Sequence, residues 1–306
     1  SWLYVAVTIT SFHAIFNRFV KEFSLKQQIK KQFGTYLSPD MVERLQRNPG
    51  LLQLGGETRE LSIMFTDVRG FTTISEHYGQ DVQGLTRIMN RYMTAMTRAI
   101  TESGGTLDKY IGDAQMAFWN APLDDHNHAK NAVRTGIKMM ISLSEFNNEI
   151  RKEGIPAFGM GLGINTDSVV VGNMGSEQRF DYTCLGDGVN LAARLEGQSK
   201  NYGVGIVLGP RTAEQIRDEI DVIELDCIAV KGKTVGVKIY TPGLEYQVHR
   251  RFLDAYYAGR WEDAVALIPQ CLKDTTGLED YYKNMSVRLE TGCPADWSGT
   301  YKATSK

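Results

Sequence analysis

Two acidic residues and a glycine turn in the middle of the chain have the types and spacing needed to bind a metal ion and a phosphate. The segment "LSIMFTDVRGFTTISE", residues 61–76, runs from a short apolar stretch into Asp67, bends at Gly70 and begins a helix at Phe71–Thr72. The later segment "DKYIGDAQMAFW" places Asp113 at a turn between two strand-like runs. Carboxylates with open coordination suit Mg²⁺ bound together with a phosphate, and N–H groups at a helix start bind phosphate oxygens. These residues therefore predict phosphate chemistry.

Asn190 and Arg194 form a second candidate pair, in "GDGVNLAARLEGQSK". They are four positions apart on a predicted helix, so they share one face. A planar guanidinium suits a phosphate that gains charge in a transition state. The alternatives are a surface asparagine beside a salt-bridging arginine, and aspartates that merely cap helices or close turns.

The elements that must position these residues alternate between helices and hairpins. We predict the following order along the chain: a strand at 61–67, a helix from Gln80 to Ser103, a hairpin turning at Gly112–Asp113, and a helix over about 124–153. Next come "AFGMGLGIN" and "VVVGNMGS" as a strand pair, the Asn190 helix, and strands near 205–208, 222–230 and 235–241.

This order predicts an α+β fold of ferredoxin-like type, an antiparallel-rich sheet flanked by helices. In such a sheet the strand carrying Asp67 and the hairpin carrying Asp113 are neighbours, so the two carboxylates converge. The alternate glycines of "GMGLGIN" lack the GxGxxG spacing of dinucleotide-binding turns. They predict a bare strand face against which another backbone packs closely.

Composition bounds the class of protein. The 306 residues can hold one domain of about 200 residues with appendages. A net charge of −2 argues against a nucleic-acid partner. The four cysteines form no CxxC pair, which favours reduced thiols in the cytoplasm over a disulfide framework or a zinc site.

The N-terminal segment is apolar at first and then basic. "SWLYVAVTITSFHAIF" is shorter than the roughly 20 residues of a full membrane span, so residues 1–20 are expected to be the end of a longer transmembrane helix. The basic residues that follow would place the rest of the chain in the cytoplasm, attached to the cell membrane. Near-heptad aromatic spacing makes 21–50 a coiled-coil-like signalling helix and linker. The alternative is an amphipathic helix packed on its own domain.

Two further boundaries complete the predicted organisation. The Pro/Gly-rich stretch "QRNPGLLQLGGE" separates the N-terminal helices from a domain at 51–243. Residues 244–306 place aromatics and alanines as paired-helix repeats do. A single such unit cannot bury its apolar face alone, so we expect it to lie on the main domain or on a partner.

Several ordered blocks resemble one known family. "FTDVRGFT", "DKYIGDAQMAFW" and "FDYTCLGDGVNLAARLE" are similar to the signature blocks of the class III nucleotidyl cyclase catalytic domain, over residues 51–243. The segment "FGTYLSPDMVERL" and the tail segments "WEDAV", "DYYKNMSVR" and "PADWSGTYK" also resemble flanking segments of membrane-tethered bacterial adenylate cyclases.

The resemblance implies a reaction and a metal site. In that family a ribose 3′-hydroxyl attacks the α-phosphorus of a nucleoside triphosphate, giving a cyclic nucleotide and pyrophosphate. By motif position, Asp67, Asp113 and the Val68 carbonyl would hold two Mg²⁺ or Mn²⁺ ions per site. Asn190 would orient the ribose, and Arg194 would meet charge at the α-phosphate.

The resemblance also implies substrate contacts shared between two chains. Lys231 in "VKGK" matches a lysine that contacts the triphosphate, with its neighbour Lys233 as the alternative. The turn at Gly70, Phe71 and Thr72 would cradle phosphates. The metals would sit on one chain, and the residues that recognise base, ribose and α-phosphate on the other: Lys109, Thr183, Asn190 and Arg194. Because this chain holds both halves, a head-to-tail homodimer with two equal sites is expected.

Lys109 and Thr183 favour ATP as the substrate. A lysine is only a donor and serves adenine N1, an acceptor, whereas guanine N1 carries a hydrogen. Thr183 can accept a hydrogen bond from the adenine amino group. Guanylate-selective members carry Glu and usually Cys at these two places, and many adenylate members have Asp in place of threonine. The expected function is therefore adenylate cyclase, with a guanylate cyclase or a catalytically silent cyclase-like module as alternatives.

Overall fold

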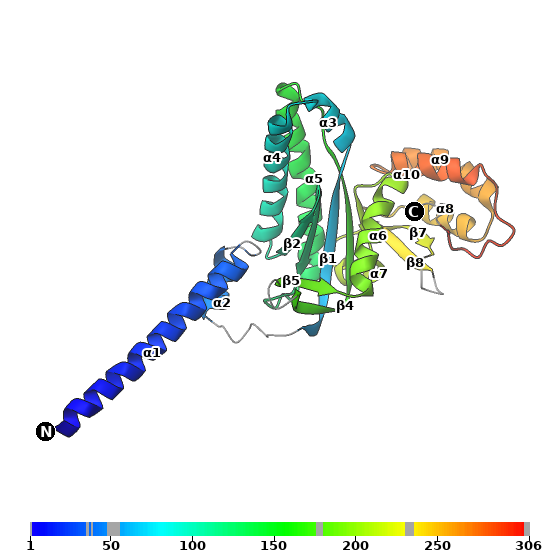
Figure 1. The fold of residues 1–306 in the computed structure, drawn as a ribbon. Coiled ribbons are helices and arrows are strands. Elements are labelled where there is room, and N and C mark those ends of the chain that lie inside the picture. Colours follow the sequence, from blue (N-terminus) through cyan, green and yellow to red (C-terminus); the bar gives the residue numbers. More distant parts are fainter. Residues whose placement is uncertain are drawn as a thin grey trace.

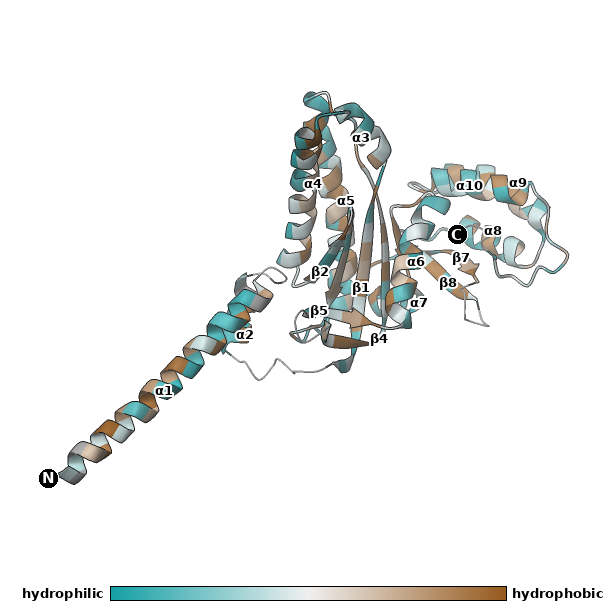
Figure 2. Cartoon of the chain, in the orientation of Figure 1, coloured by the Kyte–Doolittle hydropathy of each residue, from teal (hydrophilic) through white to brown (hydrophobic). Residues whose placement is uncertain are grey.

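The computed structural model describes residues 2–34, 37, 39–47, 56–175, 180–229 and 236–302. The N-terminal part consists of α1 (Trp2–Phe33), which projects from the body of the molecule, and α2 (Pro39–Arg47) (Figure 1). Apolar residues recur along α1 among polar ones (Figure 2). In the described part of the chain, no helix is both long and apolar enough to cross a membrane.

A mostly antiparallel sheet forms the centre of the protein. In the described residues it has eight strands in the order β2-β3-β1-β4-β6-β8-β7, with β5 paired to β4. The strands are β1 (Glu57–Arg69), β2 (Thr106–Ile111), β3 (Ala114–Trp119), β4 (Gly159–Gly175), β5 (Phe180–Leu185), β6 (Ile206–Leu208), β7 (Val222–Ile228) and β8 (Val237–Pro242). The β4–β6 pair is parallel and the other pairs are antiparallel. The predicted α+β, ferredoxin-like class is confirmed.

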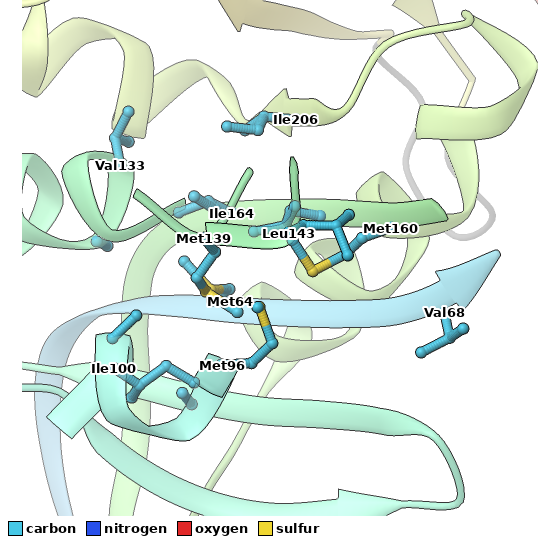
Figure 3. Packing of buried hydrophobic residues seen from close by; sticks show 14 of the residues in the cluster. Met64, Val68, Met96, Ile100, Val133, Met139, Leu143, Met160, Ile164 and Ile206 are labelled. Atoms are coloured by element: carbon cyan, nitrogen blue, oxygen red, sulfur yellow. The ribbon is translucent and has the colours of Figure 1, made fainter. Parts of the chain in front are cut away.

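Helices pack on both faces of the sheet. Those between β1 and β8 are α3 (Phe71–Tyr78), α4 (Val82–Glu102), α5 (His128–Lys152), α6 (Asp187–Asn201) and α7 (Pro210–Ile216). The long helices α4 and α5 lie side by side (Figure 1) and share a core with β1, β4 and β6. Figure 3 shows this core, in which Met64, Met96 and Met139 come from β1, α4 and α5. A second core joins the end of α1, α2 and α6 to the opposite face.

The structure corrects three predicted elements. The first strand is longer than 61–67, because β4 pairs with β1 from Glu57 to Arg69. Asp67 therefore lies two residues before the strand ends. The segments predicted as a strand pair form one continuous strand, β4, and its partner is β5, which the sequence patterns missed. The long helix begins at His128 instead of near residue 124.

Close backbone packing explains the glycines of "GMGLGIN". A Cβ at Gly163 would overlap the main chain of α6 at Ala192 and Glu196, and a Cβ at Gly161 would overlap the Ser199 hydroxyl. The prediction of a bare strand face is thus confirmed. These glycines let α6 lie directly on β4. They therefore set the distance between the sheet and the helix that carries Asn190 and Arg194.

The C-terminal helices share a core with the far end of the sheet. They are α8 (Gln247–Tyr257), α9 (Trp261–Asp274) and α10 (Glu279–Leu289). Their buried side chains form one cluster with residues of α6, β6, β7 and β8. Beyond α10 the chain returns to β7, where Tyr301 makes a parallel bridge with Ile228. The helices therefore bury their apolar faces on the sheet-bearing part of the chain.

Candidate active site

Asp67 and Asp113 meet at one end of the sheet. Asp67 lies on β1 just past the last pair of the β1–β3 ladder, Thr66 with Gln115, and Asp113 lies in the turn between β2 and β3. Burial raises the pKa of Asp67, and the negative charge of Asp113 raises it further. The predicted convergence of the two carboxylates is confirmed. Arg69 offsets only part of the repulsion between the two carboxylates. A divalent cation would neutralise the rest, so the pair is a donor set that fits such an ion.

Other oxygen ligands must complete such a site. Within the described ranges, no group of three or more His, Cys, Asp or Glu side chains is arranged to hold a metal. Val68 is buried near the end of β1. At this position β1 pairs with β4 but no longer with β3. A main-chain carbonyl there, together with water and phosphate oxygens, fits the coordination that Mg²⁺ prefers.

A glycine turn follows the strand that carries Asp67. Gly70 has φ 81°, a left-handed conformation that favours glycine, and it precedes α3 without any side-chain cap. Gly70, Phe71 and Thr72 are exposed, so the first N–H groups of α3 face solvent. Phe71 and Asp113 line the same pocket of about 810 Å³, which also borders α4. The first residue of α3 and the Asp113 carboxylate therefore border one cavity.

Glu196 connects the carboxylate pair to α6. Burial raises the pKa of Glu196 to about 7, and the charges of Asp67 and Asp113 raise it while Arg69 lowers it. The guanidinium of Arg69 donates to Ser199 Oγ and, at 3.0 Å, to the Val204 carbonyl. Sequence reasoning missed Glu196 and Arg69, because their roles depend on α6 packing over the end of β1.

Glu196 predicts a pH dependence of stability in the metal-free protein. Its pKa is about 7 in the fold against an ordinary 4.5, so the folded state holds an extra proton between these values. Stability present at low pH is therefore lost as pH rises towards and through 7. Thermal unfolding in EDTA from pH 5 to 8 should show a smaller fall in Tm for Glu196→Gln than for the parent. Mg²⁺ should reduce the difference, because it neutralises the neighbouring aspartates. Equal pH slopes in EDTA would contradict this assignment.

Lys109 and Thr183 are brought together by a third residue. Thr183, on β5, is buried and donates a hydrogen bond to Asp108 Oδ2. Lys109, on β2, lies with Nζ 3.4 Å from Asp108 Oδ1. The two side chains predicted to recognise the base thus contact one buried carboxylate, although they lie 74 positions apart in the sequence. The sequence signal for Asp108 is a charged residue inside a predicted strand, directly before Lys109.

Asn190 and Arg194 are exposed on one face of α6. Ala192, Glu196 and Ser199 occupy the opposite face, since a helix turns about 100° per residue. That opposite face packs on β4, and its Glu196 lies near Asp67 at the end of β1. Asn190 and Arg194 therefore face away from the carboxylates of their own chain. Lys231, the predicted phosphate-contacting lysine, lies outside the described residues.

Comparisons with known proteins agree with this architecture. Residues 56–244 match the model of the adenylate and guanylate cyclase catalytic domain. "Adenylate cyclase 1" of Rhizobium meliloti (strain 1021) is 35% identical over 182 residues, 60% of this chain and 27% of that protein. The chain thus spans about a quarter of that relative's length.

Two solved structures are similar at the same level. The adenylyl cyclase CyaB from P. aeruginosa is 35% identical with a TM-score of 0.58, covering 63% of this chain and 98% of that one. The guanylyl cyclase Cya2 is also 35% identical, with a TM-score of 0.56 and the same coverage. Overall identity therefore does not separate the two nucleotide specificities. The family match covers more than half of the sequence, and the chain belongs to the class III nucleotidyl cyclases through its adenylate and guanylate cyclase catalytic domain.

Proposed function

We propose that the protein is an adenylate cyclase that converts ATP to 3′,5′-cyclic AMP and pyrophosphate. The observation that carries this proposal is the junction of Lys109 and Thr183 at Asp108. Together they present a donor and a hydroxyl, which complement adenine N1 and the adenine amino group. The Rhizobium relative, named an adenylate cyclase, supports the same choice of base.

Each remaining site residue has a role in the proposed reaction. The bond between the ribose 3′-oxygen and the α-phosphorus forms while the bond from the α-phosphorus to the leaving pyrophosphate oxygen breaks. Asn190 orients the ribose, and Arg194 stabilises charge on the α-phosphate. Divalent cations bound by Asp67, Asp113 and the Val68 carbonyl would activate the 3′-hydroxyl and neutralise the triphosphate.

The substrate's phosphates would be held by main-chain and lysine groups. The exposed N–H groups after Gly70, at Phe71 and Thr72, can donate hydrogen bonds to phosphate oxygens. Lys231 is proposed as a further phosphate contact on motif position alone.

We propose a head-to-tail homodimer with two equal sites. The support is the orientation of α6, because Asn190 and Arg194 face away from Asp67 and Asp113 of the same chain. A second copy would bring these side chains to the metal-binding end of the first. In a two-fold dimer the same surfaces then build both sites.

A membrane tether at the N-terminus, with the catalytic domain in the cytoplasm, is a further proposal. Its support is the set of exposed apolar side chains on residues 2–20 of α1, such as Trp2, Phe12 and Phe19, followed by lysines. Flotation with lipid vesicles tests it: the whole chain should float, and a chain lacking residues 1–20 should not. Equal behaviour of the two would contradict the tether.

The proposed activity is tested by identifying the product. Purified protein is incubated with ATP or GTP and with Mg²⁺ or Mn²⁺, and the nucleotide products are separated. We expect cyclic AMP from ATP and little product from GTP. Predominant cyclic GMP would favour the guanylate cyclase alternative. The 35% identity to the guanylyl cyclase Cya2 is the observation behind that alternative. No product from either nucleotide would favour a silent module.

A further inference from the structure

Asp108 is buried by an irregularity in strand β2. In the β2–β3 ladder, Leu107 pairs with Ala117 and Lys109 pairs with Met116, so Asp108 is the extra residue of a β-bulge. Its side chain is 0% exposed, whereas that of Lys109 is 42% exposed. A bulge re-aims side chains, and here it turns the carboxylate inward and leaves the lysine at the surface.

Two hydrogen-bond donors and the ammonium group of Lys109 lie around this carboxylate. Thr183 Oγ1 donates to Oδ2, Lys109 Nζ lies 3.4 Å from Oδ1, and the backbone N–H of Cys184 adds a third interaction. Oδ1 itself has no hydrogen-bond partner among the described residues. An ammonium and a backbone N–H can only donate, so the ionised carboxylate is the form that fits all three groups.

The direction of the Thr183 hydrogen bond has a chemical consequence. A hydroxyl has one hydrogen and two lone pairs. Because Thr183 gives its hydrogen to Asp108, it can offer only lone pairs to a nucleotide base. The adenine amino group can donate to a lone pair, whereas guanine O6, itself an acceptor, is repelled.

We propose that Asp108 is a positioning residue that sets base specificity, by fixing Thr183 as an acceptor and holding Lys109 beside it. This inference rests on the proposed cyclase function and deepens it. Asp108 acts on the base only through these two side chains. An asparagine at position 108 could donate from its amide to Thr183 Oγ1, which would free the hydroxyl hydrogen for guanine O6.

The test compares kcat/KM for ATP, GTP and inosine triphosphate. Inosine triphosphate carries O6 and N1–H but lacks the guanine 2-amino group. In Asp108→Asn we expect the ATP/GTP ratio and the ATP/inosine triphosphate ratio each to fall by at least about tenfold. Asp218→Asn is the matched control, because it removes an exposed carboxylate on a distant salt bridge and should leave both ratios unchanged. Ratios within about twofold of the parent in Asp108→Asn would overturn the inference.

Variants of Thr183 keep the inference testable if Asp108→Asn folds poorly. Thr183→Ser retains a hydroxyl that can donate to Asp108 and should keep most of the ATP preference, whereas Thr183→Val should lose it. Equal preference in Ser and Val variants would overturn the inference. In the Thr183→Val background, Asp108→Asn should change the ratio less than it does alone.

Dissociation constants separate this inference from the proposed function. If the parent protein forms no cyclic nucleotide, the proposed activity is wrong. The preference for ATP over GTP in binding to the same variants still reports on Asp108. Loss of that preference in Asp108→Asn supports the inference, and its retention overturns it.

Discussion

Asp67→Asn is expected to lower cyclase kcat with ATP by at least about a hundredfold. The amide keeps the size of the side chain but removes the charge that a divalent cation needs. The same substitution should raise Tm in EDTA, because burial and Asp113 both disfavour the charged form of Asp67 and raise its pKa. Activity assays and thermal unfolding of the same sample measure the two effects. A loss of activity accompanied by a lower Tm would indicate damage to the fold instead of loss of a metal ligand.

Mixing two inactive variants tests whether the site is shared between chains. Asp67→Ala lacks the proposed metal ligand, and Arg194→Ala lacks the group proposed to meet the α-phosphate. In an equal mixture half of the dimers are mixed, and each mixed dimer has one intact site of two. Re-equilibrated subunits should therefore recover about a quarter of the parent activity. Activity no greater than that of the separate variants would contradict the shared site.

Arg288→Met is expected to lower the free energy of unfolding by about 3–5 kcal/mol. Arg288 on α10 donates to Asp226 Oδ2 at 2.6 Å, and the Asp226 side chain is 0% exposed. Its guanidinium also lies 3.6 Å from the centre of the Tyr301 ring. Removing the arginine leaves a buried carboxylate on β7 without its counter-ion, although the Tyr202 and Tyr256 hydroxyls still donate to it. Urea unfolding measures the loss.

Two further variants separate the charge effect from the loss of packing. Arg260→Met, in the same C-terminal part, removes an exposed pair with Asp263 and should cost less than about 1 kcal/mol. The double variant Arg288→Met/Asp226→Leu removes both buried charges and should be more stable than Arg288→Met alone. A double variant less stable than the single one would show that the charge on Asp226 is not the source of the cost.

Much of the candidate site could be predicted from short segments. The turn at Gly70, the hairpin turn at Asp113 and the helix carrying Asn190 and Arg194 each depend on neighbours within a few residues. Local periodicity and turn chemistry therefore sufficed for them. The limits of β1, by contrast, were underestimated, because its polar first residues join the sheet only through pairing with β4, about 100 positions away.

The sequence by itself determined which chemical groups are present, their order along the chain and the family to which they belong. The tertiary structure alone decided that Asp108 is buried between Lys109 and Thr183, that Glu196 lies beside the carboxylate pair, and that α6 presents Arg194 away from it. These outcomes depend on a strand bulge and on helix–sheet packing between segments far apart in the chain. Such contacts leave no periodic pattern in either segment, since each is set by the shape of the other.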